Sequence, residues 1–200
     1  MKPLLALAGL LLAACAALPG PRGENPTLYL LDAQPVALGR HPQSGLVLEL
    51  DRPRARPGYA TSQMAYVREA HRLDYYAKNR WVDAPARMLA PLLAQTLAQS
   101  GAFRAVLPAP AALAPDLRLD TELVRLEQDF TTRPSRVRLT LRLELIDLGA
   151  AKLVGTREID EAEAAASEDA RGGASAANRA LARALARSAD FCAAAASLRR

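Results

Sequence analysis

The stretch RVRLTLRLELIDL, residues 136–148, alternates apolar and polar side chains with a period of two. Every second residue from Val137 to Leu145 is apolar, and arginine, threonine or glutamate stands between them. Because successive side chains of a strand point to opposite faces, this pattern predicts a strand with one dry and one wet face. The preceding stretch DLRLDTELVRLEQDF, residues 116–130, alternates similarly until its phase shifts at residues 124–126, which predicts a β-bulge.

A third stretch, AKLVGTREIDEAE (151–163), follows a turn at Gly149 and completes a predicted antiparallel meander. Such a sheet can be solvated on one face and must be covered on the other. The predicted cover is a C-terminal helix, in which apolar and small residues recur at three-four spacing from Ala174 onward. Ser167 is its expected N-cap. Gly172 and Gly173 either delay the start of the helix or allow it to approach the sheet closely.

Charged residues on this part of the chain have two interpretations. Arg179, Arg183 and Arg187 form a stripe along the predicted helix. The preferred interpretation is a solvated helix face, since exposed charged faces are the norm, and the other is a docking surface for an acidic partner or lipid headgroups. Glu161 and Glu163 are interpreted as part of a solvated acidic stretch.

A second helix is predicted after residue 83, with Asp83 as N-cap, Pro85 in the first turn and Gly101 after its last apolar position. Pro91 should bend this helix or delay its regular start. The basic, proline-rich stretch DRPRARPGY (51–59) is predicted to be a loop. Short strands are predicted at 27–32, 45–51, 63–69, 71–77 and 103–107, and the third and fourth of these should face each other across a tight connection.

The N-terminus has the layout of a bacterial export signal: a basic start, an apolar run from Leu4 to Ala14, and then Cys15. The sequence Leu-Ala-Ala-Cys resembles a lipobox, which implies lipidation of Cys15 after cleavage. The alternative is an ordinary secretory signal, in which the cysteine is accidental. The expected organisation is a signal peptide at 1–14, a lipidated N-terminus and flexible tether at 15–26, and one folded domain at 27–198. No aspartate follows Cys15, which favours the periplasmic face of the outer membrane.

The composition excludes several classes of protein. Removal of residues 1–14 takes away one basic residue, Lys2, and lowers the formal net charge from +5 to +4. The basic residues are dispersed, so no nucleic-acid partner is expected. The chain has two histidines, His41 and His71, and no HExxH, CxxC, GxSxG, P-loop or GxGxxG pattern. We therefore expect no catalytic residues, no metal and no cofactor beyond the lipid on Cys15. With Cys15 lipidated, Cys192 has no partner for an intrachain disulfide.

Aromatic residues are only 4% of the chain, and three of them lie close together in LDYYAKNRW, residues 73–81. They either line a ligand site or fix a helix onto the sheet. Tyr75 and Tyr76 alternate across a predicted strand, so only one should face the core. Trp81 comes just before Asp83, where it could pack against the first turns of the helix. A structural role for Trp81 is therefore preferred over a lipid or partner contact.

These features together resemble the ABC-type transport auxiliary lipoproteins that accompany MCE-domain lipid transporters of the Pqi and Mla type. The resemblance covers nearly all of the mature chain. The resemblance implies a single α/β (α+β) domain with a curved, mainly antiparallel sheet covered by two helices. It also implies a non-enzymatic outer-membrane lipoprotein whose partners are a periplasmic MCE-domain protein and an ABC permease and ATPase, with ring assembly and a monomer both possible. The alternative is a structural or assembly lipoprotein that binds an outer-membrane barrel or the lipopolysaccharide machinery. The residues that carry the signature are Tyr75, Tyr76, Arg80, Trp81, Asp83 and Pro85.

Overall fold

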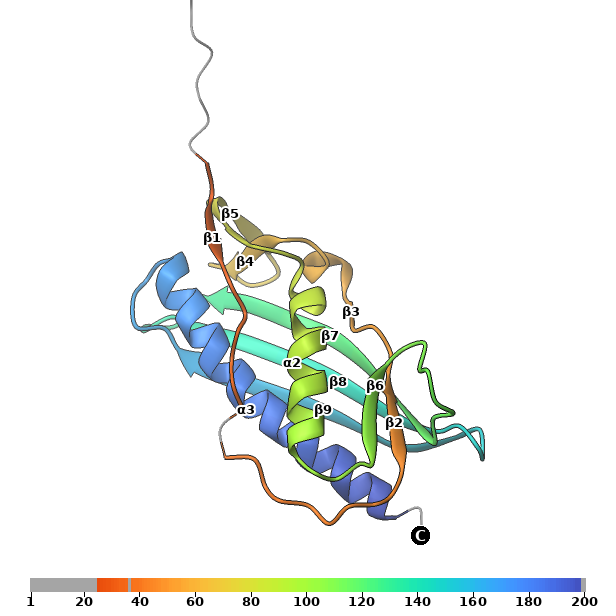
Figure 1. Ribbon diagram of the computed structural model, residues 1–200. Coiled ribbons are helices and arrows are strands. Elements are labelled where there is room, and N and C mark those ends of the chain that lie inside the picture. The colour runs from red at the N-terminus through yellow and green to blue at the C-terminus, as the bar shows by residue number, and fades with distance from the viewer. Residues whose placement is uncertain (1–24, 36, 199–200) are drawn as a thin grey trace, which may run out of the picture.

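The computed structural model describes residues 25–35 and 37–198, which form a mixed α/β domain (Figure 1). Within these residues nine strands join in a single sheet. The predicted signal peptide, Cys15 and most of the predicted tether lie outside the described residues. The strands and helices, in chain order, are β1 (Thr27–Tyr29), β2 (Val47–Leu50), β3 (Arg54–Ala55), the 3₁₀ turn η2 (Pro57–Tyr59), β4 (Gln63–Val67), β5 (Asp74–Trp81), α2 (Pro85–Gln99), β6 (Ala105–Pro108), β7 (Leu117–Asp129), β8 (Arg136–Asp147), β9 (Lys152–Ala164) and α3 (Ala170–Ser197).

The three long strands β7, β8 and β9 form the predicted antiparallel meander. The alternation along β8 is confirmed, because its five apolar residues from Val137 to Leu145 are each at most 2% exposed. The predicted bulge is also confirmed, since the register between β7 and β8 shifts between Leu123 and Arg125. These ladders give the sheet its mainly antiparallel character and place its dry face toward the helices.

The other edge of β7 carries three short strands in succession, all parallel to it: β2, β3 and β4. β6 extends the sheet beyond β2, while β5 and β1 extend it beyond β4. The predicted pairing of β4 and β5 is confirmed as antiparallel, but β5 begins at Asp74 and not at residue 71, so the connection is longer than the predicted tight one. The prediction of a plain loop at 51–59 was wrong, because this stretch contains β3 and η2. The parallel pairing itself was not predicted.

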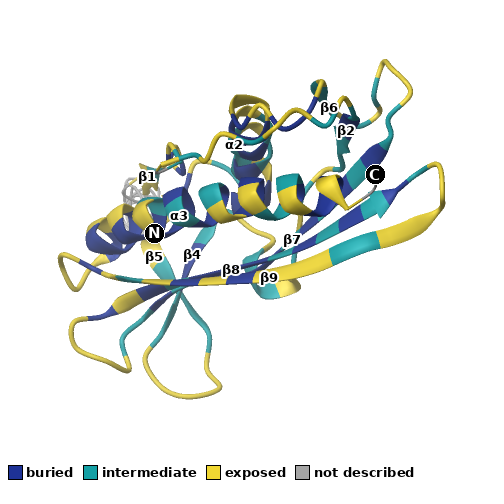
Figure 2. Ribbon diagram, turned by 90° about the horizontal axis from the view of Figure 1, so that it is seen from below, coloured by how far each residue is buried: buried dark blue, intermediate teal, exposed yellow. Residues whose placement is uncertain are grey.

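Both helices lie on one face of the meander and touch each other, as Figure 2 shows. The buried side of α3 is mainly alanine, including Ala176, Ala180 and Ala184, which are all fully buried. These short side chains allow a 28-residue helix to lie close to the leucine-rich strands. Cys192 is also fully buried on this side, and burial raises the pKa of its thiol to about 12. It therefore behaves as an apolar core residue.

The helix ends correct two predictions. Ala84, and not Asp83, is the N-cap of α2, and Asp83 makes no capping bond to the second or third helical N–H. Its carboxylate instead accepts from the neighbouring Ala84 N–H and pairs with Arg87 one turn on. Ser167 is not the N-cap of α3: the Asp169 carboxylate accepts from the Gly172 N–H at 2.8 Å, and the Ser167 hydroxyl donates to Asp169.

The prolines and the glycine of the α2 segment lie at the positions in the helix that the sequence predicted. Pro85 stands in the first turn, Pro91 lies inside the helix, and the helix ends before Gly101. Gly101 has φ +71°, a left-handed conformation that glycine adopts without strain after a helix. No helix among the described residues is long and apolar enough to span a bilayer.

Candidate functional site

The aromatic segment connects the sheet to α2. Trp81 is the last residue of β5 and is 4% exposed within the core. Tyr75 and Tyr76 are both half-buried, and their hydroxyls donate to the Gly58 carbonyl and to Gln128 Oε1, each at 2.9 Å. Tyr76 packs against the core, and burial raises the pKa of its phenol. Arg80 is exposed and is paired with Leu28 in the β1–β5 register.

The space beside these aromatics is too small for a ligand. A cavity lined by Tyr76, Trp81, Gln128 and Gly173 has a volume of about 10 Å³. One water molecule requires roughly 10–15 Å³ by the same kind of measure, and drug-sized ligands require hundreds. The segment therefore packs the sheet against the helices and does not form a ligand pocket.

A buried polar cluster, which the sequence analysis missed, connects this segment to the start of α3. Gln128 is 3% exposed; it accepts from Tyr76, and its amide donates to Ser135 Oγ at 2.9 Å. The backbone N–H of Ser135 donates to the Glu168 carboxylate. Gly173 lies against Gln128, and a Cβ at this position would be 2.2 Å from Gln128 Oε1. Gly173 therefore permits the close approach that the sequence analysis left as one of two alternatives.

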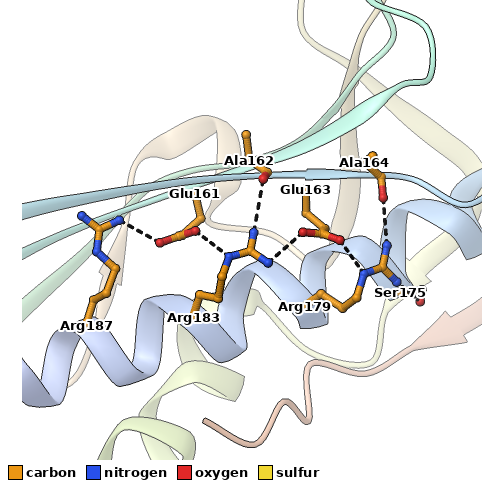
Figure 3. Close-up of polar contacts among 8 residues, drawn as sticks. All are labelled: Glu161, Ala162, Glu163, Ala164, Ser175, Arg179, Arg183 and Arg187. Carbon is orange, nitrogen blue, oxygen red and sulfur yellow. Dashed lines mark hydrogen bonds and ion pairs between the residues drawn. The ribbon is translucent and has the colours of Figure 1, made fainter. Parts of the chain in front are cut away.

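The arginine stripe of α3 is bound to the edge strand β9 (Figure 3). Arg187 and Arg183 each donate to Glu161 at 2.8 Å, and Arg183 and Arg179 each donate to Glu163 at 2.7 Å. The preferred prediction of a solvated face holds for Arg179 and Arg187, which are exposed, but the three arginines are ion-paired with β9 and do not form a free docking surface. Glu161 is 9% exposed, so its interpretation as a solvated carboxylate was wrong.

These ion pairs between the arginines of α3 and the glutamates of β9, called the ladder from here on, also protect the edge of the sheet. Arg183 and Arg179 also donate to the backbone carbonyls of Ala162 and Ala164, at 3.2 and 2.8 Å. These carbonyls belong to a strand whose pairing is with β8 alone in the described sheet. An open strand edge invites pairing with another chain, and covering its carbonyls with charged side chains removes part of that template. The hydrogen bond from Arg179 to Glu163 is the main cause that lowers the pKa of that carboxyl.

An aromatic and cationic cluster lies where β4 and β7 end. The Tyr66 and Phe130 rings meet edge to face at 6.0 Å between centroids, and the Arg68 guanidinium lies 5.2 and 5.6 Å from the two ring centres. Tyr59 nearby donates to the Glu127 carboxylate, and burial raises the pKa of its phenol. These contacts are consistent with surface packing.

Potential metal ligands and the two histidines are dispersed in the part of the chain that the structure describes. Within residues 25–35 and 37–198, no three His, Cys, Asp or Glu side chains gather as a metal site. His41 Nε2 lies 3.0 Å from Asp190 on α3, and His71 is exposed with φ +66°. His41 therefore connects the loop that precedes β2 to α3.

Comparison with known proteins gives a family match over most of the chain. Residues 29–189 match the family described as ABC-type transport auxiliary lipoprotein component. No curated protein matches the chain. Among the solved structures that are similar in fold, two cover most of this chain. Protein XCC0632 from Xanthomonas campestris has a TM-score of 0.79 at 18% identity, covering 86% of this chain and 98% of its own. A second, described as an uncharacterized protein, has a TM-score of 0.67 at 14% identity, covering 84% and 99%. At these identities the likeness concerns the fold alone.

Proposed function

The chain belongs to the family of ABC-type transport auxiliary lipoprotein components, and on that premise we propose that it is a non-enzymatic accessory of a lipid transporter. It is held at the periplasmic face of the outer membrane and acts with a periplasmic MCE-domain protein and an ABC permease and ATPase. The observation that carries this proposal is the family match over residues 29–189, on a domain whose sheet and two helices follow the expected fold.

The membrane attachment rests on Cys15. The preceding Leu-Ala-Ala supports lipidation at this thiol, and multiple acyl chains give durable anchoring. β1 begins at Thr27, so the intervening chain could extend at most about 40 Å. A domain on this tether stays close to the membrane surface, where it can receive a partner that crosses the periplasm.

The non-enzymatic role is supported by how the charged groups are used. Glu161 and Glu163 of β9 are bound by three arginines of α3. On the wet face, Arg142 joins Glu122 and Glu158, and Arg138 pairs with Asp160. These pairings hold the strands and α3 together, so the carboxylates act as structural partners.

In-cell crosslinking tests the partner assignment. The tagged full-length chain is crosslinked in its own envelope, solubilised, purified and analysed by mass spectrometry. We expect an MCE-domain protein together with an ABC permease or ATPase. Capture of an outer-membrane barrel or of lipopolysaccharide machinery in their place would support the assembly role and overturn the proposal.

The anchor is tested with Cys15→Ser in the same tagged chain. We expect the wild type to sediment with the outer membrane and to carry labelled acyl chains. The variant should lose the acyl label and leave that fraction. A Cys15→Ser chain that still carries acyl chains and sediments with the outer membrane would show that the attachment lies elsewhere.

A further inference from the structure

A groove between α2 and the sheet has the chemistry of a binding site for one phospholipid chain. We propose that it takes an acyl chain of a membrane phospholipid, and that Arg52 at its mouth binds the lipid phosphate. This inference rests on the proposed lipid-transport function and assigns a binding site to it.

The groove lies where two parallel strands end. β2 and β6 run side by side in register and finish at Leu50 and Pro108, and α2 runs alongside β6 (Figure 1). Beyond these ends is a hollow of about 560 Å³. Its lining is mainly apolar and includes Leu50, Pro53, Pro91, Ala94, Pro108 and Ala109.

The hollow exists because the side chains around it are short or rigid. Ala90 and Ala94 present single methyl groups from α2, and the three prolines cannot extend into the space. Larger residues at these positions would fill it. The volume falls within the range of roughly 300–1,000 Å³ that is usual for small-molecule sites, which are mostly apolar with a few polar groups.

The mouth of the groove is held in place by backbone hydrogen bonds. The Ala109 N–H donates to the Leu50 carbonyl at 2.9 Å, and the Asp51 N–H donates to the Leu119 carbonyl at 3.0 Å. These bonds connect the ends of β6 and β2 to each other and to β7. A site formed before its ligand arrives loses less conformational entropy on binding.

The charge at the mouth favours an amphiphile that carries a phosphate. Arg52 is exposed, and its guanidinium has no ion-pair partner in the part of the chain that the structure describes. Asp51 is the one carboxylate in the lining, and its nearest cation is Arg54 at 3.9 Å. An arginine binds phosphate oxygens through paired N–H groups, while the apolar hollow accepts the hydrocarbon chain.

Photocrosslinking in cells grown with radioactive phosphate tests the site. A benzophenone amino acid replaces Leu50, a half-buried lining residue that already carries a large side chain, or Gln95, which is exposed on α2. We expect a phosphate-labelled lipid adduct from position 50 and none above background from position 95. An acyl anchor on Cys15 carries no phosphate, so self-insertion would leave the adduct unlabelled.

Two variants test the recognition in the chain that carries the crosslinker at position 50. Ala94→Phe fills the hollow and should abolish the labelled adduct, whereas Gln95→Phe should leave it intact. Arg52→Gln should lower its yield about tenfold, the effect expected for one charge-assisted hydrogen bond to phosphate. Arg104→Gln, an exposed arginine before β6, should not change the yield. Unchanged thermal melting establishes that each variant is folded.

Three results would overturn this site. They are equal labelling at positions 50 and 95, an adduct that Ala94→Phe does not reduce, and a polypeptide adduct without phosphate. The function and the site can fail separately. Capture of the transporter without a lipid adduct rejects only the groove, and a lipid adduct without transporter capture rejects only the partner assignment.

Discussion

Trp81 lies at the junction of β5 and α2, where its ring fills core volume that no smaller side chain could occupy. We predict that Trp81→Ala lowers the free energy of unfolding by about 3–5 kcal/mol, because it removes a buried aromatic ring and leaves a cavity. Denaturant unfolding measures this loss. Val82→Ala is the matched control, since Val82 is 44% exposed and should change stability by less than about 0.5 kcal/mol. If Trp81→Ala kept its stability and lost only its transporter partner, Trp81 would be a contact residue.

At Gly173 the expected damage comes from adding atoms and not from removing them, because an added methyl group has no room. An alanine in a helix interior is favoured over glycine by about 1 kcal/mol. Gly173→Ala should nevertheless destabilise the protein by about 1–3 kcal/mol, since its Cβ displaces the Gln128 amide from Tyr76 and Ser135. Gly155→Ala is the control: its Cβ would meet only the Phe191 ring, at 3.4 Å. Equal melting temperatures for the two variants would show that the Gln128 side chain moves aside without loss of stability.

At the scale of elements, Asp169 and Ser167 are the two candidates for the N-cap of α3, and substitution of each residue distinguishes them. Asp169→Ala should cost about 1 kcal/mol of unfolding free energy, because the Gly172 N–H loses its acceptor. Ser167→Ala should cost less, because its hydroxyl only supports Asp169. Thermal denaturation of the two variants compares them. A larger loss for Ser167→Ala would restore the sequence-based assignment of the cap.

The ladder between α3 and β9 gives a dependence on pH. The arginines hold the pKa of Glu163 below its ordinary 4.5, so its stabilisation is fully present above that pH and is lost as the pH falls through the lower, folded-state pKa. The melting-temperature difference between wild type and Glu163→Gln should therefore be constant near neutrality and shrink below about pH 4.5. Glu144→Gln on the wet face is the control, since no described ion pair involves Glu144. A difference independent of pH down to pH 2 would contradict this account.

The sequence also explains which elements could be predicted. β8 was predictable because it alternates from Val137 to Leu145, and β7 because it alternates up to its bulge, while β9 was predicted from the turn at Gly149 that follows β8. β2, β3 and β4 pair with β7 over only two or three residues each, so no local signal specified a parallel partner. The ladder was hidden for a related reason. Arginines at four-residue spacing predict a charged helix face, and glutamates at two-residue spacing predict a charged strand face, but only the tertiary fold brings the two faces together.

At the scale of the whole molecule, the family match over residues 29–189 identifies an auxiliary component of ABC-type transport, and its work at a membrane is the function proposed above. The aromatic segment could be identified from the sequence as a distinctive feature, and the structure places it in the packing between sheet and helices. The apolar groove under α2 could not be found from the sequence, because its walls come from α2, two strand ends and the chain after β2. The candidate lipid site is therefore a property of the fold.

The most direct test of the central claim is the rate at which labelled phospholipid exchanges between the inner and outer membranes of living cells. Pulse-labelled cells that lack this chain are compared with cells that lack the ATPase captured with it, and with cells that lack both. We predict that each single deletion changes the exchange rate to the same extent and that the double deletion changes it no further. Re-expression of the wild-type chain should restore the rate, and Cys15→Ser should not. An exchange rate that is unaffected by loss of this chain, in cells where loss of the ATPase alters it, would contradict the account.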